Sequence, residues 1–322
     1  MKATLKVISA AIFAVGGVAA APAQAACGLT LVGSYDMVDT QYGQIGINMK
    51  IGDRSELMLI DTGAWFSFLT FAEADDMKLP TRSMGDQFVS YDTGGKRTSM
   101  VATAPSLEIG PLQVNAVDFV VAPRGRSFGK GVAGLIGANV LKHFDIELDF
   151  AKKKVNFFDS DHCPGQVVYW TQSGSANIPF KFDGSAIALP VQLDGHELWA
   201  QLDSGAFAST LTRSIALQVF GLSADSPNVV HREYSDEDGN KGTDASYVFD
   251  ALFFGGVSIA HPHLHLIEDK LGAAVRADFS RSENVPLPHL PAVILGVVEL
   301  RHLHLYIAYK EKVLYVTAAD AH

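Results

Sequence analysis

Cysteine is scarce in this chain of 322 residues, and Cys27 and Cys163 are its only two. Neither stands in the sequence context of a histidine-paired nucleophile, so the scarcity argues against thiol catalysis. In an oxidising compartment we expect one disulfide, which would tie the N-terminus to the end of the first half of the chain. Two free thiols are the alternative, and in either state we interpret both cysteines as structural.

Basic residues are also few. The chain has 25 Lys and Arg residues against 35 Asp and Glu residues, which gives a formal net charge of -10. An acidic protein of this kind is a poor candidate for binding nucleic acid or anionic lipid. Beyond the N-terminal segment, the sequence has no apolar run long enough to span a membrane. With 48% hydrophobic and 19% charged residues, the composition is that of a globular chain, long enough for two lobes.

The N-terminal segment has the pattern of an export signal. Lys2 and Lys6 form a short basic region, residues 7–21 are apolar, and small residues occupy the cleavage spacing at 23–25. The apolar run is too short for a membrane anchor. We therefore predict a signal peptide over residues 1–25 and a mature chain that is periplasmic or secreted.

Lipid anchoring is the alternative for this segment. Cys27 lies just past the apolar run, where a lipid-modified cysteine would stand. Gln24, three positions earlier, is an unfavourable residue for that modification. We therefore favour ordinary cleavage before Ala26.

One short run of residues occurs twice. Asp61-Thr62-Gly63-Ala64 recurs as Asp203-Ser204-Gly205-Ala206, 142 residues later. Residues 45–51 lead into the first copy and residues 187–193 into the second, and both stretches show the apolar alternation of a β-strand. A single Asp-Thr-Gly triplet is a weak signal. Two copies, each after such a strand, predict two lobes that each supply one carboxylate.

Acid–base chemistry explains why two carboxylates are needed. An ionised carboxylate accepts a proton but has none to give, whereas two neighbouring carboxylates share one proton. The charged member can then draw a proton from a bound water while the protonated member donates to a carbonyl oxygen. Asp61 and Asp203 are the candidates for this pair, which needs neither a covalent intermediate nor a metal.

The rest of the chain predicts an all-β fold with short helices. We expect a first lobe over residues 26–160, a turn-rich linker over residues 161–178 and a second lobe over residues 179–322. Short helices are predicted near residues 71–77 and 139–144.

Pairs of strands repeat in both halves. Residues 86–102 read as a hairpin that turns near Gly94 and Gly95, and residues 233–247 read as its counterpart. Further hairpins close each lobe. We expect a sheet between the lobes to draw on strands near the N-terminus and at residues 155–158, 167–170 and 313–316.

Four motifs in this order resemble those of the retropepsin-like aspartic peptidases, in an exported bacterial form with two lobes fused in one chain, as in pepsin. The family signature is Asp-Thr/Ser-Gly, followed later in each lobe by two apolar residues and Gly. The first lobe carries residues 61–63 and 135–137, and the second carries 203–205 and 294–296. The resemblance covers nearly the whole mature chain. It implies a bilobal acid-protease fold, with two β-barrel lobes and the active site between them.

The resemblance also implies a function. Asp61 and Asp203 would be the catalytic pair of an aspartic endopeptidase that hydrolyses peptide bonds with no cofactor and no metal. The partner would be a peptide or protein substrate, and the chain would be a monomer because fused lobes remove the need to dimerise. A catalytically inactive peptide-binding protein on the same scaffold is the alternative.

The residues that follow the aspartates would support the site in such a family member. The hydroxyls of Thr62 and Ser204 would bond across the lobe interface. Gly63 and Gly205 would leave backbone amides close to the carboxylates, where a side chain would interfere.

Other family features are less well kept. Tyr91, with Gly94 and Gly95, is a candidate for a substrate-covering flap, although an exposed aromatic on a strand is the alternative. Retroviral relatives carry Arg after the later Gly, whereas this chain has Ala138 and Val297 there. That departure puts the family's interface salt bridges in doubt, but not its chemistry.

Two competing signals remain. Residues 125–129 match a serine-hydrolase elbow around Ser127, but the glycine-rich stretch that follows is a poor helix start, so we favour a loop. His261, His263 and His265 would share one face of a strand, either as solvated side chains or as metal ligands.

Ala64 and Ala206 generate a prediction about pH. Pepsin-like members place Ser or Thr at these positions, and the hydroxyl stabilises a charged carboxylate, which alanine cannot do. We therefore expect hydrolysis in weakly acidic to neutral buffer, measured as kcat/KM against pH. A profile that peaks only below about pH 3 would contradict this.

Overall fold

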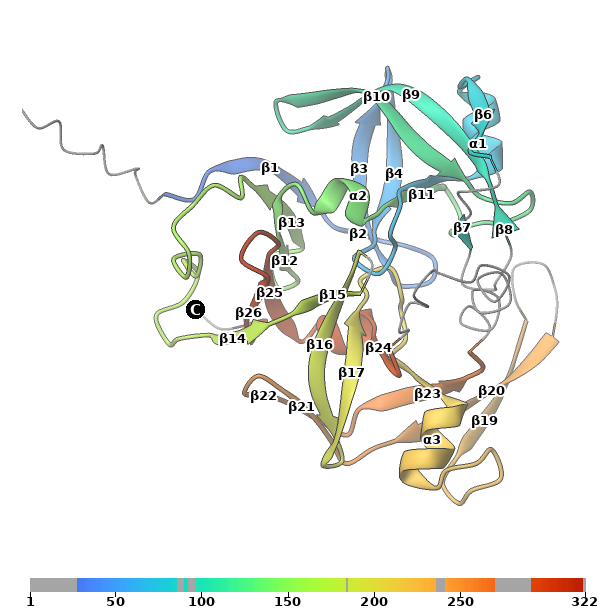
Figure 1. The fold of residues 1–322 in the computed structure, drawn as a ribbon, viewed down its shortest axis with the longest axis vertical. Coiled ribbons are helices and arrows are strands. Elements are labelled where there is room, and N and C mark those ends of the chain that lie inside the picture. Colours follow the sequence, from blue (N-terminus) through green and yellow to red (C-terminus); the bar gives the residue numbers. More distant parts are fainter. Residues whose placement is uncertain are drawn as a thin grey trace, which may run out of the picture.

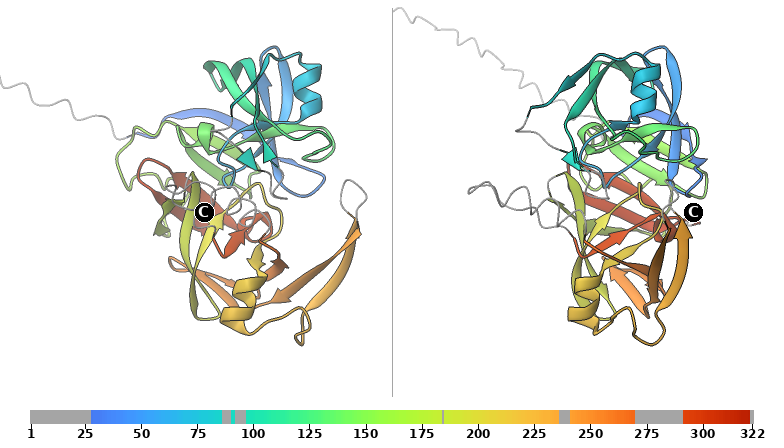
Figure 2. Two further views of the ribbon diagram at one scale, coloured as in Figure 1. Left: turned by 45° about the vertical axis from the view of Figure 1, so that its right-hand side comes forward. Right: turned by 90° about the vertical axis from the view of Figure 1, so that its right-hand side faces the viewer.

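The computed structural model describes residues 28–85, 90–91, 97–183, 185–235, 241–269 and 291–320. Two lobes built almost entirely of strands lie one above the other, and a third sheet runs beside both (Figures 1 and 2). The bilobal, mostly β architecture that the sequence predicts is confirmed. In the described part of the chain, no helix has the length and apolar character needed to cross a membrane.

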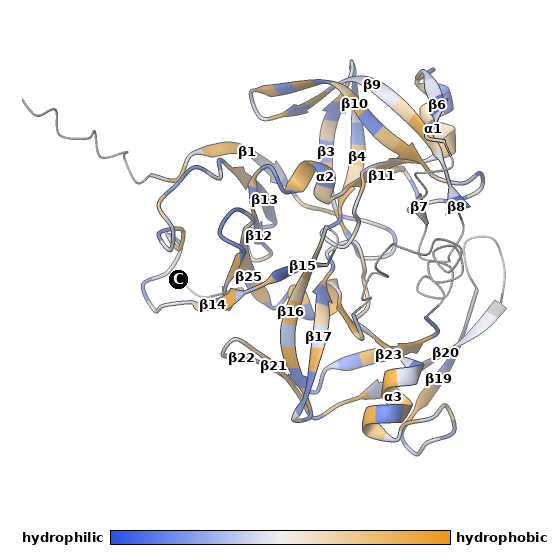
Figure 3. Ribbon diagram, viewed as in Figure 1, coloured by the Kyte–Doolittle hydropathy of each residue, from blue (hydrophilic) through white to orange (hydrophobic). Residues whose placement is uncertain are grey.

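The first lobe is an eight-stranded sheet that closes on itself. Its strand order is β2-β3-β4-β11-β5-β10-β9-β6, and an additional pairing joins β9 to β3. Apolar and polar residues alternate along β3, and its apolar side chains are buried in the lobe, whereas the first half of β10 is exposed. Figure 3 shows the hydropathy of each residue along these strands. The strands are β2 (Val38–Asp39), β3 (Ile45–Ile51), β4 (Arg54–Ile60), β5 (Phe68–Leu69), β6 (Thr81–Ser83), β9 (Met100–Ile109), β10 (Leu112–Val121) and β11 (Val132–Ile136).

Two short helices lie close to where the sequence places them. Helix α1 (Phe71–Asp76) begins after Thr70, whose Oγ1 accepts a hydrogen bond from the Glu73 amide at 3.1 Å. Helix α2 (Ala138–Leu141) follows Gly137 directly. The predicted hairpin is present as β7 (Ser90–Tyr91) paired antiparallel with β8 (Arg97–Thr98).

The second lobe repeats this plan in a ten-stranded sheet. Its main path is β19-β20-β23-β18-β24-β17-β16-β21-β22, and β15 pairs with β16. The strands are β15 (Lys181–Asp183), β16 (Ala186–Leu193), β17 (His196–Leu202), β18 (Thr210–Thr212), β19 (Val230–Ser235), β20 (Lys241–Val248), β21 (Ala251–Phe254), β22 (Val257–Ala260), β23 (His263–Ile267) and β24 (Val293–Leu295).

Two helices lie in the described part of the second lobe. Helix α5 (Val297–Leu300) is the counterpart of α2. Helix α3 (Arg213–Phe220), which the sequence analysis did not predict, ends at Gly221 in the left-handed conformation with φ 66°. A glycine that closes a helix in this way was the available sequence signal.

The long hairpin of strands β9 and β10 in the first lobe corresponds to two shorter antiparallel pairs in the second lobe, β20 with β23 and β21 with β22. The first-lobe strand β9 pairs with both β10 and β3, whereas β20 pairs with β23 and the next strand, β21, pairs with β16. The break on the returning side lies at His261, whose φ is 51°. Both lobes therefore close, the second through two short strands in place of one long strand.

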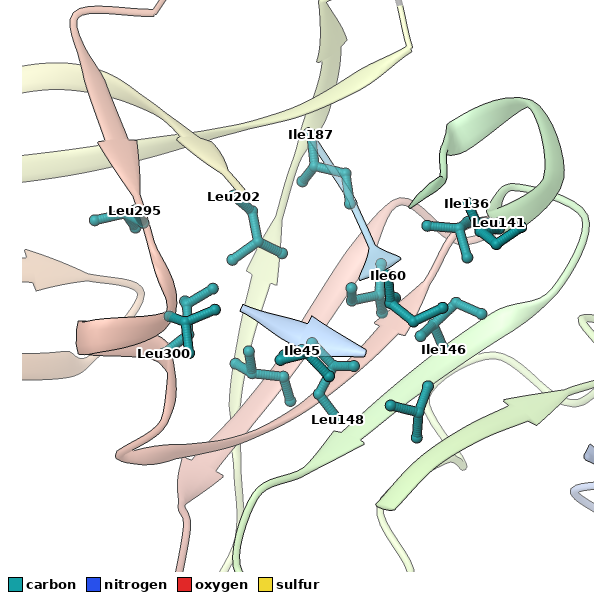
Figure 4. Packing of buried hydrophobic residues seen from close by; sticks show 14 of the residues in the cluster. Ile45, Ile60, Ile136, Leu141, Ile146, Leu148, Ile187, Leu202, Leu295 and Leu300 are labelled. Carbon is teal, nitrogen blue, oxygen red and sulfur yellow. The ribbon is translucent and has the colours of Figure 1, made fainter. Parts of the chain in front are cut away.

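A six-stranded sheet joins the lobes, in the order β1-β13-β12-β25-β26-β14. The halves of the chain meet where β12 pairs antiparallel with β25, with Ile146 opposite Ile307. Apolar residues of this sheet pack against both lobes (Figure 4). Its strands are β1 (Leu31–Asp36), β12 (Asp145–Asp149), β13 (Lys154–Phe158), β14 (Ala176–Pro179), β25 (Leu303–Ala308) and β26 (Val313–Ala318).

One strand predicted for this sheet is wrong. Residues 167–170 form no strand, and β14 takes the outer place beside β26 instead. Val167 is buried, and the Trp170 ring stacks on His304 with the ring centroids 4.2 Å apart. The apolar character that suggested a strand therefore comes from residues that cover the sheet. The exact boundaries predicted for the lobes and the linker stay predictions.

The covered face holds three buried acids, each with partners. Asp145, Glu147 and Asp149 alternate along β12. His162 contacts Asp145, and His304 lies 2.8 Å from Glu147 through Nε2. Burial of carboxylates is tolerated when such groups satisfy them.

Candidate active site

Both aspartates lie at the ends of equivalent strands. Asp61 follows β4, and Asp203 follows β17. Each strand pairs in parallel with the strand of the later motif, β4 with β11 and β17 with β24. The Asp61 amide donates to the Ile136 carbonyl, and the Asp203 amide donates to the Leu295 carbonyl, both at 3.0 Å. The four motifs therefore meet in two matching loops.

The two carboxyl groups are in contact. A side-chain hydrogen bond joins Asp61 and Asp203. Each glycine of the triplets faces the carboxyl group of the other lobe, and a Cβ atom on Gly63 or Gly205 would overlap with it. Glycine is required at both positions because of this close approach.

Backbone amides hold one oxygen of each carboxylate. The amides of Gly63 and Ala64 donate to Asp61 Oδ1 at 3.0 Å and 2.8 Å. In the second lobe, Gly205 and Ala206 donate to Asp203 Oδ1, both at 3.0 Å. This symmetrical arrangement orients both groups and leaves each Oδ2 atom for other partners.

Burial shifts both carboxyl groups toward protonation, and repulsion adds to the shift of Asp61. Burial raises the pKa of Asp61 well above its ordinary value, and the charge of Asp203 raises it further. Burial also raises the pKa of Asp203, although hydrogen bonds from Ala206, Asp61 and Gly205 oppose the shift. The pair is therefore suited to hold one proton in common, as its acid–base chemistry requires.

Thr62 and Ser204 bind the two loops to each other. The Thr62 hydroxyl donates to the Leu202 carbonyl at 2.8 Å and accepts from the Ser204 amide at 3.0 Å. The Ser204 hydroxyl donates to the Ile60 carbonyl at 2.6 Å and accepts from the Thr62 amide at 3.1 Å. Both side chains are fully buried. The structure thus places them where the resemblance implies.

The later motifs support the loops from behind. The Ala138 amide donates to the Ala64 carbonyl, and the Val297 amide donates to the Ala206 carbonyl, both at 2.8 Å. The side chains of Ala138 and Val297 are buried and apolar, so this chain packs where retroviral relatives place an arginine. A Cβ atom on Gly137 would overlap with the Phe66 carbonyl.

Sequence reasoning missed Gln201. Its Nε2 lies 3.3 Å from the Gly63 carbonyl oxygen and 3.4 Å from Asp203 Oδ2. The available signal was a polar residue at the position where the first copy of the repeat has Leu59.

Two aromatic residues beside the loops were also missed. Trp65 and Phe207 each follow the alanine of one copy, and their exposed fractions are 38% and 40%. Phe207 packs against Gly43 of the first lobe, where a Cβ atom would overlap with its ring.

Several predicted residues stay predictions. Tyr91 lies on β7, but its side chain is outside the described residues, as are Gly94 and Gly95. Cys27 is also outside them, so its pairing with Cys163 is not tested.

The histidine cluster differs from the expectation. Strand β23 begins at His263, and His261 lies in the break before it, so the three side chains do not share one strand face. His265 Nδ1 lies 2.5 Å from Asp244 Oδ2. Within the described ranges, no group of three His, Cys, Asp or Glu side chains is placed to hold a metal ion.

The competing serine motif lies in a loop. Residues 122–131 connect β10 to β11, and no helix follows Ser127. The Ser127 hydroxyl accepts a hydrogen bond from the Gly129 amide at 3.0 Å. The interpretation as a loop is confirmed.

A comparison with protein families supports the resemblance. Residues 47–143 match the family described as "gag-polyprotein putative aspartyl protease". This segment holds the first aspartate loop and the later motif of the same lobe. No curated protein matches the chain. Among solved structures, soybean basic 7S globulin matches with 11% sequence identity and a TM-score of 0.49, over 91% of this chain and 96% of that chain.

The interlobe hydroxyls predict a coupled loss of stability. We expect Thr62→Val and Ser204→Ala each to lower the free energy of unfolding by about 2 kcal/mol, because each leaves buried backbone groups without a partner. The double variant should lose less than the sum, because the two side chains bond each other's loop. Urea denaturation measures all three, with the exposed Thr81→Val as the control. Strictly additive losses would contradict the interlobe bonding.

The shared proton predicts a stability gain on neutralisation. A carboxyl group whose pKa is higher in the folded state destabilises the fold as pH rises from the unfolded value through the folded value. Asp61→Asn should therefore raise Tm at pH 7 by a few degrees, about 1–3 kcal/mol, and the gain should vanish near pH 3. Thermal unfolding at both pH values measures this. An unchanged or lower Tm at pH 7, relative to the exposed Asp53→Asn, would contradict it.

Proposed function

We propose that this protein is an aspartic endopeptidase that hydrolyses peptide bonds with a water molecule held between Asp61 and Asp203. The observation that carries the proposal is the contact between these two carboxyl groups, each of which also accepts two backbone amides. A purely structural role would not require two mutually repelling carboxyl groups at one place in the fold. A pair that must share a proton is useful for acid–base chemistry.

The reaction follows from the shared proton. The charged carboxylate takes a proton from the water while its oxygen attacks the peptide carbonyl carbon, and the protonated carboxyl gives its proton to the carbonyl oxygen. In the resulting tetrahedral diol, one hydroxyl returns a proton to the pair. The carboxyl group that took a proton from the water then gives that proton to the leaving nitrogen as the C–N bond breaks. Both aspartates end in their starting states, and no cofactor takes part.

The remaining expectations are part of the same proposal. The substrate is an extended peptide whose backbone pairs with strands beside the loops. We propose that the chain acts as a monomer, because both carboxylates come from one polypeptide. Export by a signal peptide over residues 1–25 places it in the periplasm or outside the cell.

Cleavage-site profiling tests the proposal. Purified mature chain is incubated with a proteome-derived peptide library, beside Asp203→Asn and the exposed Asp53→Asn as the matched control. We expect cleavage by the wild type and the control, and a loss of at least about 1,000-fold in Asp203→Asn because one member of the carboxyl pair is gone. Ser127→Ala should retain activity.

Two outcomes would contradict the proposal. Peptide binding without turnover in the wild type, with affinity unchanged in Asp203→Asn, would identify an inactive peptide-binding protein. Loss of cleavage in Ser127→Ala with full activity in Asp203→Asn would identify a serine hydrolase.

A further inference from the structure

The two copies of the active-site repeat differ two residues before the aspartate. In the first lobe this position is Leu59, which is 2% exposed and packs in an apolar cluster with Phe68 and Leu135. In the second lobe it is Gln201, which is only partly buried. The rest of the two loops matches closely, and in both loops two backbone amides donate hydrogen bonds to the Oδ1 atom of the aspartate. A polar side chain on one side alone makes the pair asymmetric.

The Gln201 amide group lies at the junction of the two loops. Its Nε2 is 3.4 Å from Asp203 Oδ2 and 3.3 Å from the carbonyl oxygen of Gly63 in the other lobe. Within the described part of the chain, it is the one non-acidic side chain that donates to either aspartate. Among the described residues, Asp61 Oδ2 has no equivalent side-chain donor, because Leu59 cannot provide one.

We propose that Gln201 is a positioning residue that keeps the negative charge of the pair on Asp203 and leaves the proton on Asp61. The proposal rests on the proposed function. A hydrogen-bond donor favours the ionised form of the carboxylate that it contacts, so an amide on Asp203 alone breaks the symmetry. Alanine follows both glycines and has no hydroxyl for either carboxylate. The Gln201 amide supplies a side-chain donor on one side only.

This asymmetry assigns the two roles. Asp203 takes the proton from the attacking water, and Asp61 donates its proton to the substrate carbonyl oxygen. The directions of the pKa shifts agree, because hydrogen bonds from Asp61 and Gln201 oppose the rise at Asp203, whereas contact with Asp203 adds to the rise at Asp61.

The electrostatic surroundings do not provide the same distinction. Among the described residues, Tyr309, which follows β25, is a further titratable group whose pKa the charge of Asp61 raises. Its ring is buried, and burial raises the pKa of its phenol, so it stays neutral over the range in which the pair titrates. The charge asymmetry therefore depends on a neutral donor.

The test is Gln201→Met, which keeps the length and shape of the side chain and removes the amide. Gln192→Met, on the exposed face of neighbouring strand β16, is the matched control. Two measurements are made on the full mature chain: kcat/KM against pH, and a substrate-free carbon-13 NMR titration of labelled aspartate carboxyl groups. Removal of the donor should move the acid limb of the rate profile, and the lower carboxyl titration, upward by about 0.5–1 pH unit.

The outcomes separate this proposal from the proposed function. If Gln201→Met changes kcat/KM by the same factor at every pH and leaves both titrations in place, the residue is structural and the proposal is wrong. If the wild type hydrolyses nothing, the endopeptidase proposal fails, while the NMR titration still decides whether Gln201 fixes the charge. An equal upward shift in Gln192→Met would also overturn the assignment, because that side chain lies outside the site.

Discussion

The structure depends on holding two mutually repelling carboxyl groups in contact. Burial and repulsion raise the pKa of Asp61, so their proximity costs free energy that other interactions must offset. The reciprocal bonds of Thr62 and Ser204 provide a direct connection, because each hydroxyl both donates to and accepts from the opposite lobe. Those bonds are buried, where water does not compete for them. The fold itself therefore holds the two loops in one arrangement.

The six-stranded sheet places the loops within reach of each other. It takes β1, β12 and β13 from the first half of the chain and β14, β25 and β26 from the second. The apolar core runs without interruption from one lobe through this sheet to the other. Buried acids on β12 have histidine, tyrosine and backbone partners, so the covered face combines packing with specific hydrogen bonds. The lobes consequently form one continuous scaffold around the site.

Local patterns predicted the strands well and failed where long-range contacts decide. Residues 45–51 alternate apolar and polar, and they form β3 with those limits. Residues 167–170 have strand-like composition, but their side chains cover the shared sheet, because β14 takes the edge position. The alternation of the three histidines near residue 263 predicted one strand face, but His261 has a left-handed backbone conformation and lies outside the strand. Helix α3 was not predicted, because its sequence signal was the single glycine, Gly221, that ends it.

The sequence by itself determined that the chain is mostly β, that it repeats one loop, and that each copy carries one aspartate. These properties are local, because alternation and short motifs are read within a few residues. Only the tertiary structure decided that Asp61 and Asp203 touch, that their pKa values rise, and that Gln201 reaches one of them and not the other. The physical reason is that the pKa of a carboxyl group depends on burial and on neighbours 142 residues away, which no local pattern records.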